Sequence, residues 1–185
     1  DNLIQGEEGA DVIAGGAGAD ELFGGSGNDT ITGGLGIDLV VGGAGDDTVL
    51  ITSGNDLLTG GTFIGEAGDD TLSTNQTSLD LTAPNLEINT IETIKSTNAG
   101  AATFVLDQGV FTDLQFANAA ITLQSTGTGG SIQLNGAGTF DFAALTGVTL
   151  TNLPNIVAGD VNGAGVADSN VLLQQTLTGS DTADL

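Results

Sequence analysis

The sequence contains no cysteine, histidine, methionine, tryptophan or tyrosine among its 185 residues. Without cysteine and histidine the chain has no disulfides, no thiol or imidazole catalyst and none of the usual ligands of zinc or iron. It also lacks a run of about 18 apolar residues and a basic segment ahead of an apolar stretch, so it predicts neither a membrane span nor a secretory signal. These absences exclude most catalytic mechanisms, and we expect a protein that is not an enzyme.

Basic residues are almost absent as well. Lys95 stands against 24 acidic residues, which gives a net charge of -23. A chain with this charge repels nucleic acid and anionic membranes, so we expect no nucleic acid as a partner and no direct membrane insertion. Apolar residues still make up 39% of the sequence and glycine is frequent, at 31 residues. Cations are therefore the expected partners, and we expect folding to depend on them.

A nine-residue pattern repeats through the N-terminal part of the chain. Its copies begin at Gly6, Gly15, Gly24, Gly33, Gly42, Ile51 and Gly65, the last after an insertion that we place at residues 60–64. The sixth position of every copy is an aspartate: Asp11, Asp20, Asp29, Asp38, Asp47, Asp56 and Asp70. The eighth position is always aliphatic: Ile13, Leu22, Ile31, Val40, Val49, Leu58 and Leu72. A flexible Gly/Asp-rich linker, the competing interpretation, has no reason to keep an aliphatic residue at that position.

Each repeat predicts half of a flattened coil. A short strand with its middle residue facing inward is followed by a glycine-rich turn, because glycine adopts positive φ at little cost. Two repeats then close one coil of about 18 residues, and coils stack at the strand spacing of about 4.8 Å. Aspartates two repeats apart, such as Asp20 and Asp38, would lie above one another. We expect register to be unbroken from Asp11 to Asp56.

Stacked carboxylates require a cation between them. At about 4.8 Å two unit charges repel by roughly 0.9 kcal/mol in water and about 3.5 kcal/mol at an effective dielectric of 20. A hard divalent ion with oxygen ligands removes this repulsion, and main-chain carbonyls in the turns can complete its shell. Magnesium demands stricter octahedral geometry, so the pattern favours several calcium ions.

The pattern resembles the RTX, or hemolysin-type, family of calcium-binding repeats, whose consensus is G-G-x-G-x-D-x-U-x, over about residues 1–73. The resemblance implies an all-β, right-handed parallel β-roll with calcium in its turns. It also implies that each ion is held by two sixth-position aspartates, by carbonyls two and four of one turn, and by carbonyls one and three of the other. One site would be Gly16, Gly18 and Asp20 with Gly33, Leu35 and Asp38. A second would be Gly25, Gly27 and Asp29 with Gly42, Ala44 and Asp47.

The same rule extends to less regular turns. It adds Glu7, Gly9, Gly24, Ser26, Gly34, Gly36, Gly43, Gly45, Ile51, Ser53, Gly65 and Ala67 as carbonyl ligands, with Asp11, Asp56 and Asp70 as carboxylate ligands. The residues that precede the sixth position are interpreted as turn formers rather than ligands. They are Asn28, Asp46, Asn55 and Asp69.

Beyond residue 74 the glycine–aspartate rhythm stops. Short alternating segments predict an all-β region over residues 75–178, either a looser parallel β-helix or, as the alternative, an antiparallel sandwich. The expected strands are Leu86 to Lys95, Thr103 to Leu106, Leu114 to Phe116, Ile121 to Leu123, Ile132 to Leu134, Phe140 to Phe142 and Val148 to Leu150. Residues 179–185 resemble the start of another repeat. The roll itself is expected to span residues 1–74.

Two short motifs in the second half bear on function. Asp160, Asn162 and Asp168 follow the spacing of an EF-hand-like loop and are candidate metal ligands. Because Ala164 and Val171 occupy two ligand positions of that loop, an Asx-rich turn is the competing interpretation. Residues 91–94, Ile-Glu-Thr-Ile, resemble a linking segment of RTX surface-layer proteins and giant adhesins.

Together these features predict a calcium-binding structural module of a secreted bacterial cell-surface protein, similar to a surface-layer protein. The resemblance implies an extracellular location and type I secretion, and copies of the chain are expected to assemble into a lattice or filament. Two alternatives remain at this point. One is an adhesin or ligand-binding module, and the other is the carrier segment of a secreted RTX enzyme.

Overall fold

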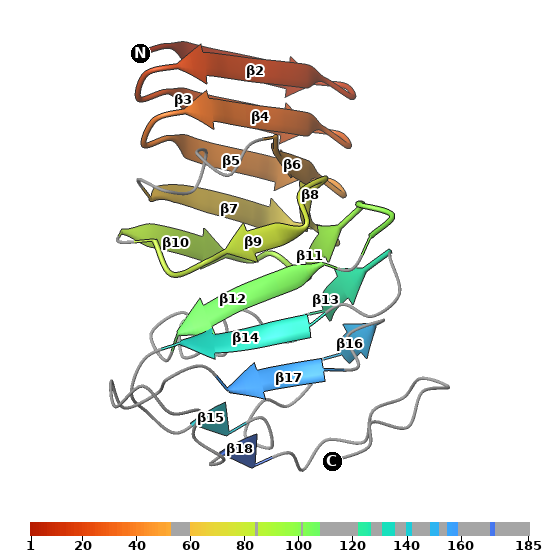
Figure 1. Cartoon of the computed structure of the whole chain (residues 1–185). Coiled ribbons are helices and arrows are strands. Elements are labelled where there is room, and N and C mark those ends of the chain that lie inside the picture. Colours follow the sequence, from red (N-terminus) through yellow and green to blue (C-terminus); the bar gives the residue numbers. More distant parts are fainter. Residues whose placement is uncertain are drawn as a thin grey trace.

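The computed structural model describes residues 1–52, 60–83, 85–100, 102–107, 122–126, 131–135, 140–141, 149–151, 155–158 and 171–172. Every regular element in these ranges is a β-strand (Figure 1). The strands are β1 (Leu3–Glu8), β2 (Val12–Ala17), β3 (Glu21–Ser26), β4 (Thr30–Leu35), β5 (Leu39–Ala44), β6 (Thr48–Ile51), β7 (Gly61–Ala67), β8 (Thr71–Thr74), β9 (Ser78–Asp80), β10 (Leu86–Asn89), β11 (Thr93–Ser96), β12 (Thr103–Asp107), β13 (Thr122–Ser125), β14 (Ser131–Asn135), β15 (Phe140–Asp141), β16 (Thr149–Thr151), β17 (Asn155–Ala158) and β18 (Val171–Leu172).

The strands stack as successive coils of a β-solenoid. The first sheet has the order β1-β3-β5-β7-β10, the second β2-β4-β6-β8-β11-β13-β16, and the third β9-β12-β14-β17, while β15 pairs with β18. Every described pair is parallel. This pairing confirms the predicted β-roll that continues into a β-helix. It excludes the antiparallel sandwich for the described strands of the second half.

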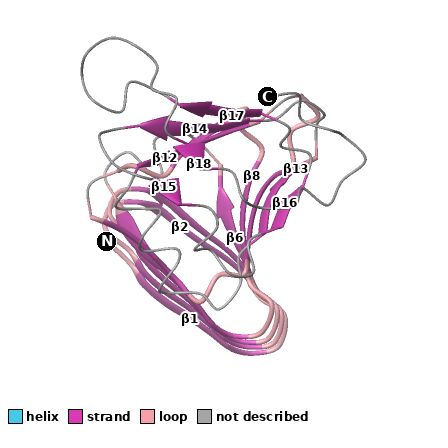
Figure 2. Ribbon diagram, turned by 90° about the horizontal axis from the view of Figure 1, so that it is seen from below, coloured by secondary structure: helices cyan, strands magenta, loops and turns pink. Residues whose placement is uncertain are grey.

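The coil widens along the chain. In the second sheet Thr30 pairs with Thr48, two nine-residue repeats further on, whereas Thr48 pairs with the more distant Thr71. The step is longer still from Thr93 to its partner Thr122. The added length forms the third sheet, which begins at β9. Seen along the stack, β12, β14 and β17 form a separate face from the strands of the N-terminal coils (Figure 2).

Inward side chains of the described strands build the core. In the second sheet these side chains are Ile13, Ile31, Val49, Leu72, Ile94 and Leu123; in the first, Leu22, Val40, Phe63 and Ile88; in the third, Leu79, Phe104 and Ile132. All are at most 6% exposed. Burying one such side chain stabilises the fold by about 1.5–3 kcal/mol. The predicted inward role of the eighth position is thus confirmed for six residues, and Leu58 lies outside the described residues.

The position predicted for the insertion is wrong, although an insertion does lengthen the coil between Thr48 and Thr71. The strand that pairs with β5 is β7, which places Phe63 beside Val40. The residues predicted to be inserted therefore form the strand itself. The physical reason is that the glycine-rich turn must follow its strand directly, and Thr62-Phe63-Ile64 offers an alternating β segment just before the turn that starts at Gly65. The residue aligned with Asp38 by this pairing is Gly61 rather than Asp56.

The second half differs from its predicted strands in four places. The single strand expected from Leu86 to Lys95 is two strands, β10 and β11, which belong to different sheets. Strands β9, β17 and β18 arise where none was predicted. The expected strand from Leu114 to Phe116, the loop of Asp160, Asn162 and Asp168, and residues 179–185 lie outside the described residues. No described helix has the length and apolarity to cross a membrane.

Candidate metal centre

The turns between coils carry the sixth-position aspartates into the interior. Asp20, Asp29, Asp38, Asp47 and Asp70 are 1–4% exposed. The turns reach this shape because their second and fourth positions adopt left-handed backbone conformations, as at Gly25 (φ 112°) and Gly27 (φ 122°), which side chains rarely tolerate. The glycines thus fix the turn that buries each carboxylate.

The aspartates on one side of the solenoid form a continuous hydrogen-bonded series, here called the long ladder, which consists of Asp11, Asp29, Asp47 and Asp70. The backbone N–H of Asp11 donates to Asp29 Oδ1, that of Asp29 to Asp47 Oδ1 and that of Asp47 to Asp70 Oδ1, each at 2.8 Å. Register therefore continues through the longer coil to Asp70.

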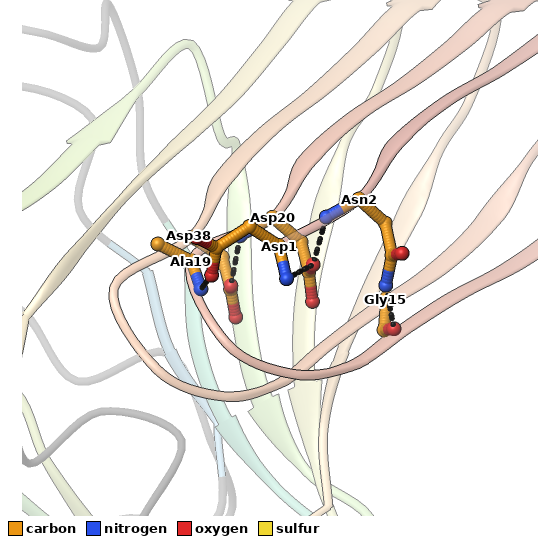
Figure 3. A network of polar contacts seen from close by, with 6 residues as sticks. All are labelled: Asp1, Asn2, Gly15, Ala19, Asp20 and Asp38. Atoms are coloured by element: carbon orange, nitrogen blue, oxygen red, sulfur yellow. Dashed lines mark hydrogen bonds and ion pairs between the residues drawn. The ribbon is translucent and has the colours of Figure 1, made fainter.

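The opposite side carries a short ladder of Asn2, Asp20 and Asp38 (Figure 3). The backbone N–H of Asn2 donates to Asp20 Oδ1 at 2.6 Å, and that of Asp20 donates to Asp38 Oδ1 at 2.9 Å. The N-terminal ammonium of Asp1 lies 3.7 Å from Asp20 Oδ1. The structure thus brings together the predicted pairs Asp20 with Asp38 and Asp29 with Asp47.

The second carboxylate oxygen of five ladder aspartates has no hydrogen-bond partner in the described residues. Oδ2 of Asp11, Asp20, Asp29, Asp47 and Asp70 is buried without a hydrogen bond. A buried acceptor left unsatisfied costs about 1–3 kcal/mol, and more when it is charged. Five such atoms at equivalent positions therefore indicate a shared requirement for positive charge.

Carbonyl oxygens face the unpartnered carboxylate oxygens. A Cβ added at Gly15 would lie 2.6 Å from Asp20 Oδ2 and 2.7 Å from the carbonyl oxygen of Gly33 in the next coil. At Gly6 the same point would lie 2.6 Å from both Asp11 Oδ2 and the carbonyl oxygen of Gly24. Carboxylate and carbonyl oxygens are the ligands of hard cations such as calcium. The first glycine of each repeat keeps this space free of side-chain atoms.

The sequence that carries these oxygen donors matches a known repeat family. A family model of four copies of the RTX calcium-binding nonapeptide repeat matches residues 1–31, 23–58 and 50–76. Residues 1–76 are RTX repeats. The predicted family is thereby confirmed, and the RTX roll is a structural calcium-binding fold that is not catalytic by itself. RTX proteins are generally secreted by bacteria. Comparison with curated proteins gave no match, and comparison with solved structures gave none.

The carbonyls at positions one and three of the RTX turns lie in two different environments. Those at position one of Gly24, Gly33 and Gly42 face the unpartnered Oδ2 of Asp11, Asp20 and Asp29. Those at position three accept hydrogen bonds of 2.7–2.8 Å from position-four N–H groups one coil earlier. The pairs are Ser26 with Gly9, Leu35 with Gly18, Ala44 with Gly27 and Ala67 with Gly45. Among the described residues no three acidic side chains gather, so a cation here would need main-chain oxygens as well.

The remaining predicted ligands occupy recognisable places in the RTX turns. Gly16, Gly25, Gly34 and Gly43 at position two, and Gly9, Gly18, Gly27, Gly36 and Gly45 at position four, have left-handed φ values of 104–143°. Glu7 holds position two with φ 76° despite its side chain. Ile51 ends β6 as a buried residue, Gly65 is buried against Asp70, and Ser53 and Asp56 lie outside the described residues.

The residues that precede the aspartates behave as predicted for turn formers. The backbone N–H of Asp46 donates to Asn28 Oδ1 at 3.1 Å, and that of Asp69 donates to Asp46 Oδ1 at 3.0 Å. All three side chains are exposed. They link the outer edge of successive RTX turns, and Asn55 lies outside the described residues.

Burial changes the acidity of the long ladder. The pKa of Asp70 is raised to about 6, mainly by burial and also by the negative charges of Asp47, Glu92 and Asp46, although a hydrogen bond from the Asp47 backbone lowers it. Burial also raises the pKa of Asp47. Asp47 and Asp70 thus retain protons more readily than free aspartate because burial disfavours their charged forms.

Sequence reasoning missed one acidic residue of this network. The backbone N–H of Asp70 donates to Glu92 Oε2 at 2.7 Å, so Glu92 follows Asp70 in the long ladder. A sequence signal was present, because an acid, a threonine and an aliphatic residue recur in Asp29-Thr30-Ile31, Asp47-Thr48-Val49, Asp70-Thr71-Leu72 and Glu92-Thr93-Ile94. The three threonine pairings Thr30–Thr48, Thr48–Thr71 and Thr71–Thr93 follow this signal.

Proposed function

We propose that this chain is a calcium-binding structural module of a secreted bacterial cell-surface protein, and that it folds when calcium fills the gaps between its coils. The observation that carries the proposal is the series of buried, unpartnered Oδ2 atoms in the two ladders. An apolar interior cannot hold such charges without compensation. A metal bound between two carboxylates supplies the missing charge and accepts the carbonyl oxygens that face them.

The two ladders contain four gaps between successive aspartates in the described residues. They lie between Asp11 and Asp29, Asp29 and Asp47, Asp47 and Asp70, and Asp20 and Asp38. We assign one calcium ion to each. Because the two ligating carboxylates come from different coils, no site exists before the coils stack, and binding free energy becomes folding free energy. Each ion at 100 times its Kd adds about 2.7 kcal/mol of stability.

Coupling of this kind suits export. At low calcium the chain stays unfolded and can pass a secretion channel, and calcium outside the cell then stabilises the folded module. In a surface-layer-like assembly, copies of the chain would form the lattice through side chains that no coil buries. Large apolar side chains of this kind are present at Leu3, Val12, Leu35 and Ile37, which are 51–87% exposed.

A calcium titration followed by circular dichroism tests the proposal. The chain, dialysed against calcium-free buffer, should gain a β-sheet spectrum as calcium is added and should gain none with magnesium at the same concentration. A chain that is fully folded in chelator, with no spectral change on adding calcium, would falsify the proposal. Size-exclusion chromatography and electron microscopy of the same samples test assembly, for which ordered oligomers only in calcium are expected.

A further inference from the structure

The last turn of the long ladder has an unusual length. Between Ile64 of β7 and Thr71 of β8, each of which pairs with a residue of the next coil, the turn comprises residues 65–70, as in the other RTX turns. One coil later, Asn89 pairs with Ile64 and Thr93 pairs with Thr71, so residues 90–92 alone span the same gap. The glycine-rich turn is absent here, and the match to the RTX repeat ends at residue 76.

Glu92 nevertheless occupies the ladder position. Its Oε2 accepts the backbone N–H of Asp70 at 2.7 Å, as Asp70 Oδ1 accepts that of Asp47 at 2.8 Å. The backbone N–H of Thr93 donates to the Asp70 carbonyl at 3.0 Å, as that of Thr71 donates to the Asp47 carbonyl at 2.9 Å. The additional methylene of glutamate places the carboxylate where aspartate stands in the longer turns.

Two further observations indicate a ligand in this gap. Asp70 is 1% exposed, and its Oδ2 is buried without a hydrogen-bond partner. A Cβ added at Gly65 would contact both this Oδ2 and the carbonyl oxygen of Thr90. Asp20 Oδ2 and the Gly33 carbonyl oxygen flank Gly15 in the same way. Thr90 has φ 49°, a conformation that a β-branched residue rarely adopts, and its carbonyl is directed at Gly65 in this conformation.

We propose that Asp70, Glu92 and the Thr90 carbonyl bind a further calcium ion, which joins the RTX roll to the first wider coil. The inference rests on the proposed function, since it requires calcium in the long ladder. It extends the metal sites beyond the RTX repeats to a glutamate that lies outside their consensus. The wider coils then become linked to calcium through β11, which pairs with both β8 and β13.

Counting bound calcium tests this site. Glu92→Gln removes the charge but keeps an oxygen that can accept the Asp70 N–H. Glu87→Gln removes one charge from an exposed position on β10 and is the matched control. In equilibrium dialysis with metal analysis by mass spectrometry, E92Q should bind one calcium ion fewer than the unaltered chain, and E87Q should bind the same number. Equal numbers in E92Q and the unaltered chain would overturn the inference.

The outcomes separate this inference from the proposed function. An unaltered chain that binds no calcium contradicts both, whereas an unaltered chain that binds calcium together with an unaffected E92Q contradicts the Glu92 site alone. If circular dichroism shows E92Q to be unfolded in calcium, Glu92→Asp decides, because it keeps the charge and withdraws it by one methylene. For E92D the free calcium needed to fill the last site should rise about tenfold or more, and an unchanged filling curve contradicts the inference.

Discussion

The RTX roll and the wider coils after residue 74 solve the same stacking problem with different chemistry. In the roll the strands bury apolar side chains such as Leu22 and Phe63, and the turns bury Asp20, Asp29, Asp38, Asp47 and Asp70. In the wider coils the core is also apolar, with Phe104 and Leu106 buried, but hydroxyl residues rather than carboxylates line one corner. Thr74, Ser96 and Ser125 stack there as buried hydroxyl residues.

The hydroxyl corner satisfies its own hydrogen bonds. Ser96 Oγ donates to the Gln76 carbonyl at 2.8 Å, and Thr126 Oγ1 donates to the Ser96 carbonyl at 2.7 Å. No comparable donor reaches Oδ2 of Asp11, Asp20, Asp29, Asp47 or Asp70. The neutral hydroxyls of this corner form hydrogen bonds within the protein, whereas the buried carboxylates require the charge of a cation. On the proposed function, the stability of the roll depends on bound calcium, whereas that of the wider coils rests mainly on apolar burial.

Removal of calcium should separate the two regions most clearly. By hydrogen exchange and mass spectrometry, amides of residues 11–51 should lose protection by about 100-fold for each ion previously held at 100 times its Kd. Amides of β12 should lose much less, because Phe104 and its neighbours need no ion to stay buried. An equal loss of amide protection in both regions would mean that the molecule unfolds as one unit, which would contradict the proposed difference between the roll and the wider coils.

Neutralising one ladder residue should weaken two gaps at once. Asp29 faces both Asp11 and Asp47, and Asp29→Asn keeps an oxygen for the Asp11 N–H while removing the charge. The midpoint of the calcium titration should rise about tenfold or more, which corresponds to roughly 1.4 kcal/mol. The control is Asp46→Asn, at an exposed turn position, for which a shift below twofold is expected. Similar shifts in the two variants would contradict a special role for buried carboxylates.

Acid should partly replace calcium in the roll. The folded-state pKa of Asp70, about 6, lies above its ordinary value of 3.8, so the folded state binds more protons between these values. In calcium-free buffer this contribution to stability is present below about pH 4 and is lost as pH rises through about 6. Circular dichroism in calcium-stripped buffers should therefore show more folded chain at pH 4.5 than at pH 7.

The acid effect has its own control. Asp70→Asn cannot bind the extra proton, so the dependence on pH should flatten in that variant. A calcium-free chain that becomes more folded as pH rises from 4.5 to 7 would contradict the sign of the effect. In saturating calcium the trend should reverse, since metal and protons compete for the same carboxylates.

The smallest expected effect concerns backbone strain in the final RTX turn. Glu66 adopts φ 78° at a position where the other turns have glycine, apart from Glu7. Glu66→Gly should raise the free energy of unfolding by about 1 kcal/mol, measured by urea unfolding in saturating calcium. Glu8→Gly removes the same charge from strand β1, where φ is ordinary, and should lower stability by about 0.5–1 kcal/mol. Stabilisation by both variants would point to charge rather than strain.

The roll could be predicted from sequence because its geometry is strictly periodic. A nine-residue period fixes which aspartates share an edge and which aliphatic residues face inward, and Asp29 with Asp47 and Ile31 with Val49 follow directly. The predicted positions of the insertion and of the next strand are wrong where the nine-residue period changes, between Thr48 and Thr71. The copy that holds Asp56 keeps the glycine, aspartate and aliphatic residue at positions four, six and eight, yet β5 pairs with β7, because pairing depends on the strand that precedes the next complete turn.

Glu92 escaped prediction for a related reason. The repeat pattern requires a glycine-rich turn, and the turn at residues 90–92 has only three residues. The pattern also requires aspartate, whereas Glu92 reaches the same place through one more methylene. The wider coils offered only alternating segments, which indicate strands without giving their sheet. Their partition between the second and third sheets depends on coil length, which is not constant: the step from Thr71 to Thr93 is shorter than the next step, from Thr93 to Thr122.

The parallel pairing of the strands has a mechanical consequence. Because strands lie across the stacking direction, a pull along the stack acts in line with the hydrogen bonds between coils, and coils would detach one after another. An ion held between carboxylates of neighbouring coils opposes the same displacement. With calcium in the gaps as proposed, the long ladder would place such a tie at every gap from Asp11 to Asp70, whereas hydroxyl and main-chain hydrogen bonds bridge the corner at Ser96 and Ser125. Calcium would then stiffen the roll more than the wider coils, and under load the wider coils would extend first.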